Sequence, residues 1–364
     1  MKIKTIVLIS LRGGIDGLNV VIPYKEENYF RLRPSIAVAK NKTIELDNQF
    51  ALHQSLASIF PLYEAGQLAF IHAVGWPSES HSHFQVWEEI ELGVSESDSG
   101  VRPATGWIAR YLQGLPSGSS ALRAVSIGEK PSRALSGLSG AATIKTLADF
   151  QLAKVKDEAL FCQSLKMFYS KSSLKDFGMQ TFDALGYLAS LKDESIAIDK
   201  LGYPNTEFGH SLHTVEKLIK SGVGLEAACV DFDGWDTHFL QPAIMEAKLS
   251  ELAEAISTFT TSLGEKMEST LIVAMSEFGR RVQENASQGT DHGQGGLMFV
   301  SGAGVEGGRV YTDWPGLGKD DLVGPGDLRA TTDVRDVLSE IVQGNKNGQI
   351  FPGYSAVKRF GFLQ

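Results

Sequence analysis

Short apolar runs rich in β-branched residues, each bounded by glycine or polar residues, recur along the chain. Near-continuous apolarity of this kind is typical of strands in a parallel sheet that is covered on both faces. Amphipathic segments lie between the runs, and this alternation predicts βαβ units and a doubly wound α/β sheet. The expected strands are Thr5–Ser10, Leu68–Val74, Leu122–Ile127, Leu225–Asp231, Thr270–Met275 and Leu297–Val300, and the expected helices are Leu52–Glu64, His83–Leu92, Thr105–Leu112, Leu212–Lys220, Pro242–Leu263 and Val334–Val342.

The middle of the chain, residues 117–209, has a different pattern, with many Ser, Lys and Ala residues and fewer strand-like runs. Its segments Leu147–Lys156 and Met179–Leu191 have helical character but carry no obvious chemistry. We therefore expect one α/β domain over residues 1–364, with a helical insertion or cap at 117–209 that packs on the sheet.

Composition narrows the function classes. The chain has 364 residues and a net charge of −9, with no block of Lys or Arg, which argues against nucleic acid or an anionic membrane as the main partner. The two cysteines, Cys162 and Cys229, have no CxxC spacing and do not indicate a metal knuckle. No apolar stretch reaches transmembrane length. The expected location is cytoplasmic for the chain as given, and periplasmic or secreted if a leader was removed.

A glycine-rich turn follows the first expected strand, in the stretch LRGGIDGLN at residues 11–19. Glycines allow positive φ angles and a close approach of the backbone to a ligand. Asp16 is then placed to bind a cation and Arg12 to bind an anion. Alone, however, the segment favours a tight βα turn in which Asp16 caps a helix.

Serine and histidine alternate in SESHSHFQVWEE, residues 78–89, just before the helix expected from His83. A helix N-terminus offers unpaired N–H groups and a positive dipole end, which suit a phosphate or sulfate. Ser82, or alternatively Ser80, is a candidate nucleophile if a metal or base lowers the pKa of its hydroxyl. Ser82 also fits a purely structural N-cap, and the neighbouring histidines tilt the interpretation towards function.

Acidic residues and histidines follow two further strands, and ligands gather outside the carboxyl ends of strands in α/β sheets. In CVDFDGWDTHFLQ, residues 229–241, Asp236 and His238 can place two ligands on one metal ion. In SEFGRRVQENASQGTDHGQGG, residues 276–296, Glu277 ends a strand. Asp291 and His292 follow in a polar loop and are further candidate metal ligands. The polar setting makes His292 a better candidate than a histidine in an apolar run.

Taken together, these segments resemble the DUF1501 family, a family of unknown function assigned to the alkaline phosphatase and sulfatase superfamily. Further matching marks are GWIARYL at 106–112, DGWDTH at 233–238, GGRVYTDWPGL at 307–317 and DLRATTDVRDVL at 327–338. They cover most of the chain except the middle insertion. The resemblance implies an alkaline phosphatase-like fold, in which a central, mostly parallel sheet with helices on both faces holds one or two divalent metals.

Members of that superfamily hydrolyse or transfer phosphoryl or sulfuryl groups through a nucleophilic Ser, Thr or formylglycine. The resemblance implies that Asp236, His238 and His292 bind the first metal, that Asp16 binds the second, and that Ser82 is the nucleophile.

The sequence departs from the superfamily at Glu277-Phe278, where Asp-His is usual. Glu277 can still coordinate a metal but Phe278 cannot, so we expect one well-held divalent ion, bound through His238 and His292. The formylglycine motif of sulfatases is also missing after the second strand, which argues against ordinary sulfatase chemistry.

These observations predict a metal-dependent hydrolase that acts on a small-molecule or glycan ester of phosphate or sulfate. Arg12 or Arg280 would neutralise the oxygens of the transferred group. Water is an alternative nucleophile, with His83 or Asp291 as the base. The expected ion is zinc, and manganese, calcium and magnesium are alternatives.

The alternative function is a non-catalytic anion- or glycan-binding protein on a retained hydrolase scaffold, because a fold does not settle function. The arrangement of side chains in space separates the two. The hydrolase prediction expects five side chains to line one pocket at the carboxyl edge of the sheet, namely Asp16, Asp236, His238, Glu277 and His292.

Overall fold

The apolar runs form one large central sheet. The computed structural model describes residues 3–96, 102–116, 120, 122–146, 157–190, 197–342 and 350–364. Over these residues the main sheet has nine strands in the order β11-β5-β10-β9-β1-β8-β6-β7, with β12 paired to β5. The strands are β1 (Thr5–Arg12), β5 (Leu68–Gly75), β6 (Ala124–Ile127), β7 (Ala141–Ile144), β8 (Ala227–Asp233), β9 (Thr270–Met275), β10 (Gly296–Gly302), β11 (Arg309–Tyr311) and β12 (Thr332–Asp333).

The centre of the sheet is parallel, as its apolar sequences predict. β1 pairs in parallel with both β8 and β9, and β8 pairs in parallel with β6. β10 is the exception, because it runs antiparallel to both β9 and β5. The loop after β9 therefore returns to the sheet at the edge where β9 ends, and the start of β10 lies beside the carboxyl ends of β1, β8 and β9.

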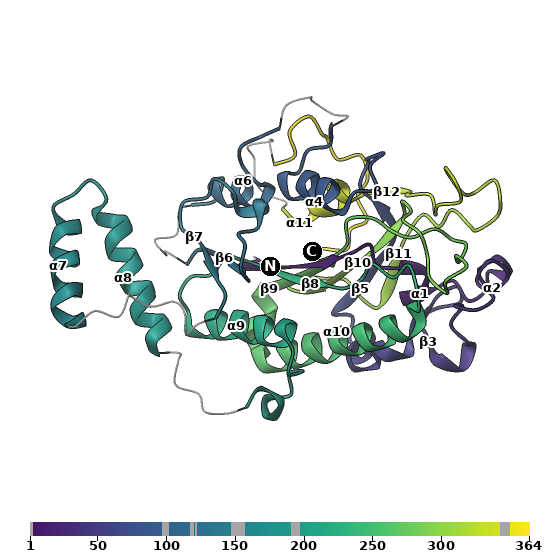
Figure 1. Cartoon of the computed structure of the whole chain (residues 1–364), viewed down its shortest axis with the longest axis horizontal. Coiled ribbons are helices and arrows are strands. Elements are labelled where there is room, and N and C mark those ends of the chain that lie inside the picture. Colours follow the sequence, from purple (N-terminus) through teal and green to yellow (C-terminus); the bar gives the residue numbers. More distant parts are fainter. Residues whose placement is uncertain are drawn as a thin grey trace.

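Helices cover both faces of this sheet (Figure 1). α9 (Glu207–Ser221) and α10 (Gln241–Leu263) pack on one face through a core that includes Leu212, Val215 and Leu249. α4 (His83–Leu92), α6 (Trp107–Gln113) and α11 (Val334–Ile341) cover the other face. The predicted fold class, a mixed α/β fold with a mostly parallel central sheet and helices on both faces, is confirmed.

The helix expected over Leu52–Glu64 is wrong in its first half. Residues Ala51–His53 instead form β4, which pairs with β2 (Val21–Ile22) and β3 (Thr43–Glu45) in a separate three-stranded sheet. A 3-10 helix, Gln54–Ile59, follows, and the α-helix α3 spans only Phe60–Glu64, with a proline in its first turn. Pro61 lacks an N–H group and fits only near a helix start, so a helix does not run through it from Leu52. The residues Ala51–His53 pair with β2 and β3 instead.

The region from 117 to 209 contributes β6 and β7 to the central sheet before its helices begin. α7 (Glu158–Ser170) and α8 (Lys175–Ser190) lie against each other at one end of the molecule (Figure 1). The helical segment expected at Leu147–Lys156 lies outside the described residues. Shorter elements complete the described chain: α1 (Gly17–Val20), α2 (Glu27–Leu32) and the 3-10 segments Lys40–Lys42, Arg133–Leu135, Ile198–Leu201 and Gly264–Ser269. None of the helices in the described part of the chain has the length and apolarity needed to cross a bilayer.

Candidate metal centre

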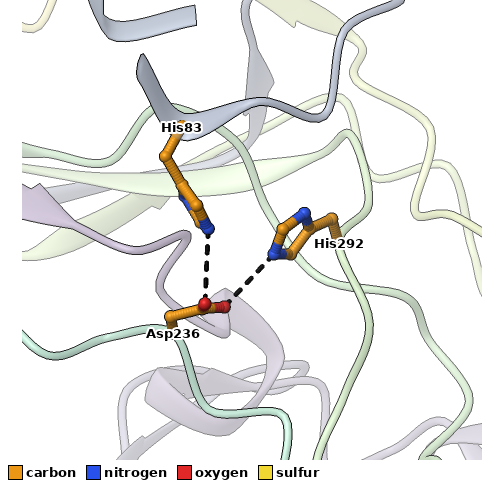
Figure 2. Close-up of side chains that lie close together, drawn as sticks. All are labelled: His83, Asp236 and His292. Atoms are coloured by element: carbon orange, nitrogen blue, oxygen red, sulfur yellow. Dashed lines mark hydrogen bonds and ion pairs between the residues drawn. The ribbon is translucent and has the colours of Figure 1, made fainter.

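Two loops and one helix start meet at the carboxyl edge of the sheet. The loop after β8 carries Asp236 and His238, and the loop between β9 and β10 carries His292. α4 begins at His83, which faces both loops (Figure 2). An isolated bridge between Arg280 and His292 closes the β9–β10 loop on itself, so that His292 returns to the edge where β9 ends.

Glycines allow these loops to approach one another. Gly13 has a φ of 120°, and a Cβ atom there would lie 2.4 Å from the backbone nitrogen of Asp236. A Cβ atom on Gly293 would lie 2.6 Å from the carbonyl carbon of Arg280. Both positions require glycine because real Cβ atoms do not tolerate such contacts. The Gly-Gly turn thus admits the neighbouring loop that carries Asp236.

A carboxylate and three imidazoles converge at this edge. His83, Asp236 and His292 each offer a ligand atom, and these atoms all lie within 4.8 Å of one another. Oδ1 of Asp236 lies 3.2 Å from Nε2 of His292, and Oδ2 lies 3.5 Å from Nε2 of His83 (Figure 2). His238 adjoins this group, with its Nε2 atom 3.1 Å from Asp236 and 3.0 Å from Nε2 of His292. These residues form the candidate centre.

An acceptor lies against the Nδ1 atom of each imidazole. Nδ1 of His83 lies 2.6 Å from Oε1 of Glu277, and Nδ1 of His292 lies 3.0 Å from the carbonyl oxygen of His81. Nδ1 of His238 lies 3.4 Å from a carboxylate oxygen of Asp291. A carbonyl or carboxylate oxygen beside Nδ1 fixes the proton there, so each neutral ring presents the lone pair of Nε2 to the centre. Histidines that bind metals are held by partners in this way.

The donor set fits a metal ion. Nε2 of His83 is buried and has no hydrogen-bond partner, and an orphaned buried polar atom needs an explanation. The Nε2 atoms of His238 and His292 approach to 3.0 Å, where two lone pairs repel each other unless a proton or cation is shared between them. Imidazole nitrogens with a carboxylate are a ligand set that divalent transition metals prefer.

The pKa shifts in the centre follow from its contacts. Burial alone would raise the pKa of Asp236, but the hydrogen bond and charge of Arg280 outweigh it and lower this pKa to about 2. The hydrogen bond with Glu277 raises the pKa of His83 although burial opposes the shift. Burial lowers the pKa of His292. Asp236 is therefore ionised and His292 favours its neutral form, which are the forms that bind a metal, whereas His83 favours its protonated form and would release a proton on metal binding.

Glu277 is not placed as a direct member of this group. Its side chain is fully buried, and it accepts hydrogen bonds from the backbone of Gly13, from Ser276 and from His83. Burial would raise the pKa of Glu277, but the bond with His83 and the other donors lower it. An ionised carboxylate behind a ligand histidine orients the ring and raises its basicity.

Asp16 also differs from the expectation, since the structure places it outside the centre. Its carboxylate forms a buried ion pair with Arg33, accepts a 2.5 Å hydrogen bond from Gln241, and caps α1 through the backbone of Leu18. The side chains of Asp16 and Arg33 are 1% and 0% exposed. A carboxylate neutralised by a guanidinium group is poorly suited to a second metal, and the capping contact matches the simpler interpretation of the turn.

The two arginines proposed to bind an anion differ in their surroundings, and only Arg280 is fully buried. Arg12 forms an ion pair with Asp231 at 2.9 Å. Arg280 has no exposed side-chain surface, and it donates to Asp236 and to the backbone carbonyls of the surrounding loops, among them those of Gly14 and Thr290. Arg280 thus ties three loops together around Asp236 and has a structural role.

Ser82 directly precedes His83 as the N-cap residue of α4, and its side chain makes no capping hydrogen bond. Its backbone nitrogen donates to the hydroxyl of Ser80, and the residue is exposed. The purely structural N-cap interpretation therefore has no side-chain contact to support it.

The sequence predicts only a base at His83 and a ligand at Glu277, whereas the structure brings His83 together with Asp236 and His292. The signal for His83 is its place at the start of the helix that follows β5, near the carboxyl end of that strand. The hydrogen bond between His83 and Glu277 joins residues 194 positions apart in the chain. No local pattern reveals such a contact.

Glu277→Gln is expected to weaken divalent metal binding by about 10- to 100-fold, because a neutral amide no longer raises the basicity of His83. Isothermal titration with zinc measures this change directly. Glu89→Gln is the matched control, since Glu89 is a buried glutamate on α4 that instead accepts from Trp76. Equal zinc affinities for Glu277→Gln and wild type would show that Glu277 does not act through His83.

A protein-family model described as "Protein of unknown function (DUF1501)" matches residues 3–339 of the chain. A search of curated proteins finds no match.

Several solved structures are similar to this one. The C-terminal periplasmic domain of EcEptC from Escherichia coli, in complex with Zn, has 7% identity and a TM-score of 0.38, covering 83% of this chain and 74% of that one. The alkaline phosphatase from the Antarctic bacterium TAB5 has 9% identity and a TM-score of 0.33, covering 86% and 95%. The PsFucS1 sulfatase from Pseudoalteromonas sp. has 12% identity and a TM-score of 0.37, covering 85% and 64%. Likeness at this level is no evidence of a shared activity.

Proposed function

The chain belongs to the DUF1501 family, and from the geometry of its candidate centre we propose that it is a metal-dependent hydrolase of phosphate or sulfate esters. The observation that carries the proposal is the set of three Nε2 atoms and one carboxylate at the carboxyl edge of the sheet, with each Nδ1 atom beside an acceptor. Structural metal sites are closed by protein ligands, whereas catalytic sites stay open to substrate. The side chains of Asp236 and His238 are 47% and 38% exposed, which leaves the centre open to an ester.

The roles of the residues follow from their positions. His83, Asp236 and His292 would hold one divalent ion, with His238 beside them, and the imidazole-rich donor set favours zinc. A metal ion held there would polarise the ester and lower the pKa of the attacking hydroxyl or water. Glu277 holds the ring of His83, and Arg280 holds the carboxylate of Asp236.

Ser82 is the proposed nucleophile. Its oxygen would attack the phosphorus or sulfur atom and displace the alcohol, and water would then release the transferred group from Ser82. Its position at the N-terminus of the ten-residue helix α4 places it at the positive end of the helix dipole, which favours the developing negative charge.

Ser82→Ala is expected to lower turnover by orders of magnitude while metal content stays unchanged. The free energy of unfolding should change by less than about 0.5 kcal/mol, because the hydroxyl makes no capping bond that the change could remove. Steady-state assays and urea unfolding of the same preparation measure both. Ser80→Ala, measured in parallel, tests the alternative nucleophile, whose hydroxyl instead bonds Gln85 and the backbone of Ser82. Full turnover by Ser82→Ala would instead assign the attack to water.

A panel of aryl phosphate and aryl sulfate esters tests the proposed function. The chain is stripped with a chelator, and its activity is compared before and after zinc, manganese, magnesium or calcium is restored. We expect hydrolysis that is lost with the metal and recovered with zinc. A metal-loaded chain that binds phosphate or sulfate but hydrolyses no ester on the panel would favour the anion-binding function instead.

A further inference from the structure

A second polar cluster, made of His81, Arg281 and Asp327, lies beside the candidate centre. Asp327 is fully buried, and neither of its carboxylate oxygens has a hydrogen-bond partner. Nε of Arg281 is also buried without a partner. Buried polar atoms without partners are rare in native proteins and each calls for an explanation. An anion cannot satisfy the oxygens of Asp327, but this carboxylate lies at ion-pair distance from Arg281 and His81, so it can hold these two side chains while their other donors face a ligand.

The distances show that this cluster is only loosely closed. Oδ1 of Asp327 lies 3.7 Å from Nε of Arg281, and Oδ2 lies 3.8 Å from Nε2 of His81. Both distances exceed hydrogen-bond length. The side chains of Arg281 and His81 are 36% and 43% exposed, so both reach solvent while Asp327 lies behind them.

The cluster touches the candidate centre on two sides. The carbonyl oxygen of His81 lies against Nδ1 of His292, and the backbone nitrogen of Arg281 donates to the carbonyl oxygen of Asp291. Nη1 of Arg281 lies 3.4 Å from the carboxylate of Asp291, which itself adjoins His238. A group bound by Arg281 would therefore lie next to the imidazoles of the centre.

Arg281 has a free donor next to the imidazoles, whereas Arg280 has none and Arg12 lies against Asp231 and Glu91. Arg280 is buried with its donors directed to Asp236 and to backbone carbonyls, and Arg12 is paired with Asp231. Nη2 of Arg281, in contrast, donates to no residue in the described part of the chain. A guanidinium group matches the paired oxygens of a phosphoryl or sulfuryl group, and charge-assisted bonds of this kind are the strong ones.

We propose that Arg281 and His81, with Asp327 behind them, bind the anionic oxygens of the substrate next to the metal centre. This inference rests on the proposed function and names the group that selects an anionic ester. Arg280 lies against Asp236, Arg281 lies against Asp291 and Asp327, and Glu277 adds a further carboxylate behind His83. The excess of negative charge means that an anion binds only when a divalent cation is present.

Isothermal titration of inorganic phosphate and of sulfate into the zinc-loaded chain tests this inference. Arg281→Met is expected to weaken phosphate binding by about ten-fold or more, and Arg281→Lys by less, because a lysine keeps the charge but not the paired donors. His81→Ala should weaken binding by a smaller factor. Arg309→Met is the matched control, since Arg309 is an exposed arginine at the start of β11, at the opposite edge of the sheet.

The zinc content of each variant is measured on the same samples and should equal that of wild type. Unchanged phosphate affinity in Arg281→Met at full zinc content would overturn the inference and leave the metal centre standing, as would a zinc-loaded wild type that binds neither phosphate nor sulfate. A wild type that binds phosphate equally well without metal would overturn the charge argument and the inference. A wild-type chain that holds no metal would contradict both the proposed function and the inference. The measured zinc content distinguishes this result from a loss of phosphate binding alone.

Discussion

Asp236→Ala is expected to reduce the bound divalent metal from about one ion per chain to almost none. The carboxylate of Asp236 is the point on which the Nε2 atoms of His83, His238 and His292 converge. Its loss removes the only charged ligand of the proposed set and leaves the positive charge of Arg280 beside the centre. Repulsion from that guanidinium group would then oppose any cation. Elemental analysis after equilibrium dialysis against zinc measures the change.

The control for this experiment is Asp233→Ala. Asp233 is an exposed acid three residues before Asp236, at the end of β8, and it does not belong to the group of three residues that could hold a metal. Wild-type metal content in Asp233→Ala excludes a general effect of charge near the site. Retention of the metal by Asp236→Ala would mean that the imidazoles hold it without the carboxylate, and the proposed ligand set would be incorrect.

Asp16→Asn is expected to lower the free energy of unfolding by about 3–5 kcal/mol and to leave the metal content of the folded chain unchanged. The substitution leaves the fully buried guanidinium group of Arg33 without its carboxylate partner. Arg33 also donates to the backbone carbonyls of Arg281 and Val282, so it would remain held in the core. Urea unfolding followed by circular dichroism measures the loss.

The double substitution Asp16→Leu with Arg33→Met gives the matched comparison, because removing both charges of a buried pair costs far less than removing one. It should restore most of the stability that Asp16→Asn loses. A chain in which Asp16→Asn keeps its stability but loses bound metal would return Asp16 to the role of a metal ligand.

The sequence predicts the sheet well because its central strands are buried on both faces. The run Thr270–Met275 is short and rich in apolar and β-branched residues, which favours a buried strand, and β9 has the predicted bounds. The helix His83–Leu92 is also as predicted, with Gly93 ending it in a left-handed conformation. Local patterns fail at Ala51–His53, where pairing with Val21–Ile22 decides the structure.

Less of the site could be predicted from the sequence, because many of its contacts join residues that lie far apart in the chain. Asp236 and His238 follow β8, and His292 lies in the loop after β9. Both strands end at the same edge of the sheet, so the topology predicts that these three side chains lie close together. The ion pair of Asp16 and the hydrogen bond of Glu277 depend on side chains that only the complete fold brings within reach. Whether a carboxylate binds a metal or supports a histidine is decided by such contacts.

The most direct test of the proposed metal centre is anomalous X-ray diffraction at the zinc absorption edge, from crystals grown with zinc. We predict one strong anomalous peak per chain, between the Nε2 atoms of His83 and His292 and the carboxylate of Asp236. A peak beside Asp16, two peaks of equal height, or no peak between these three side chains would contradict this prediction.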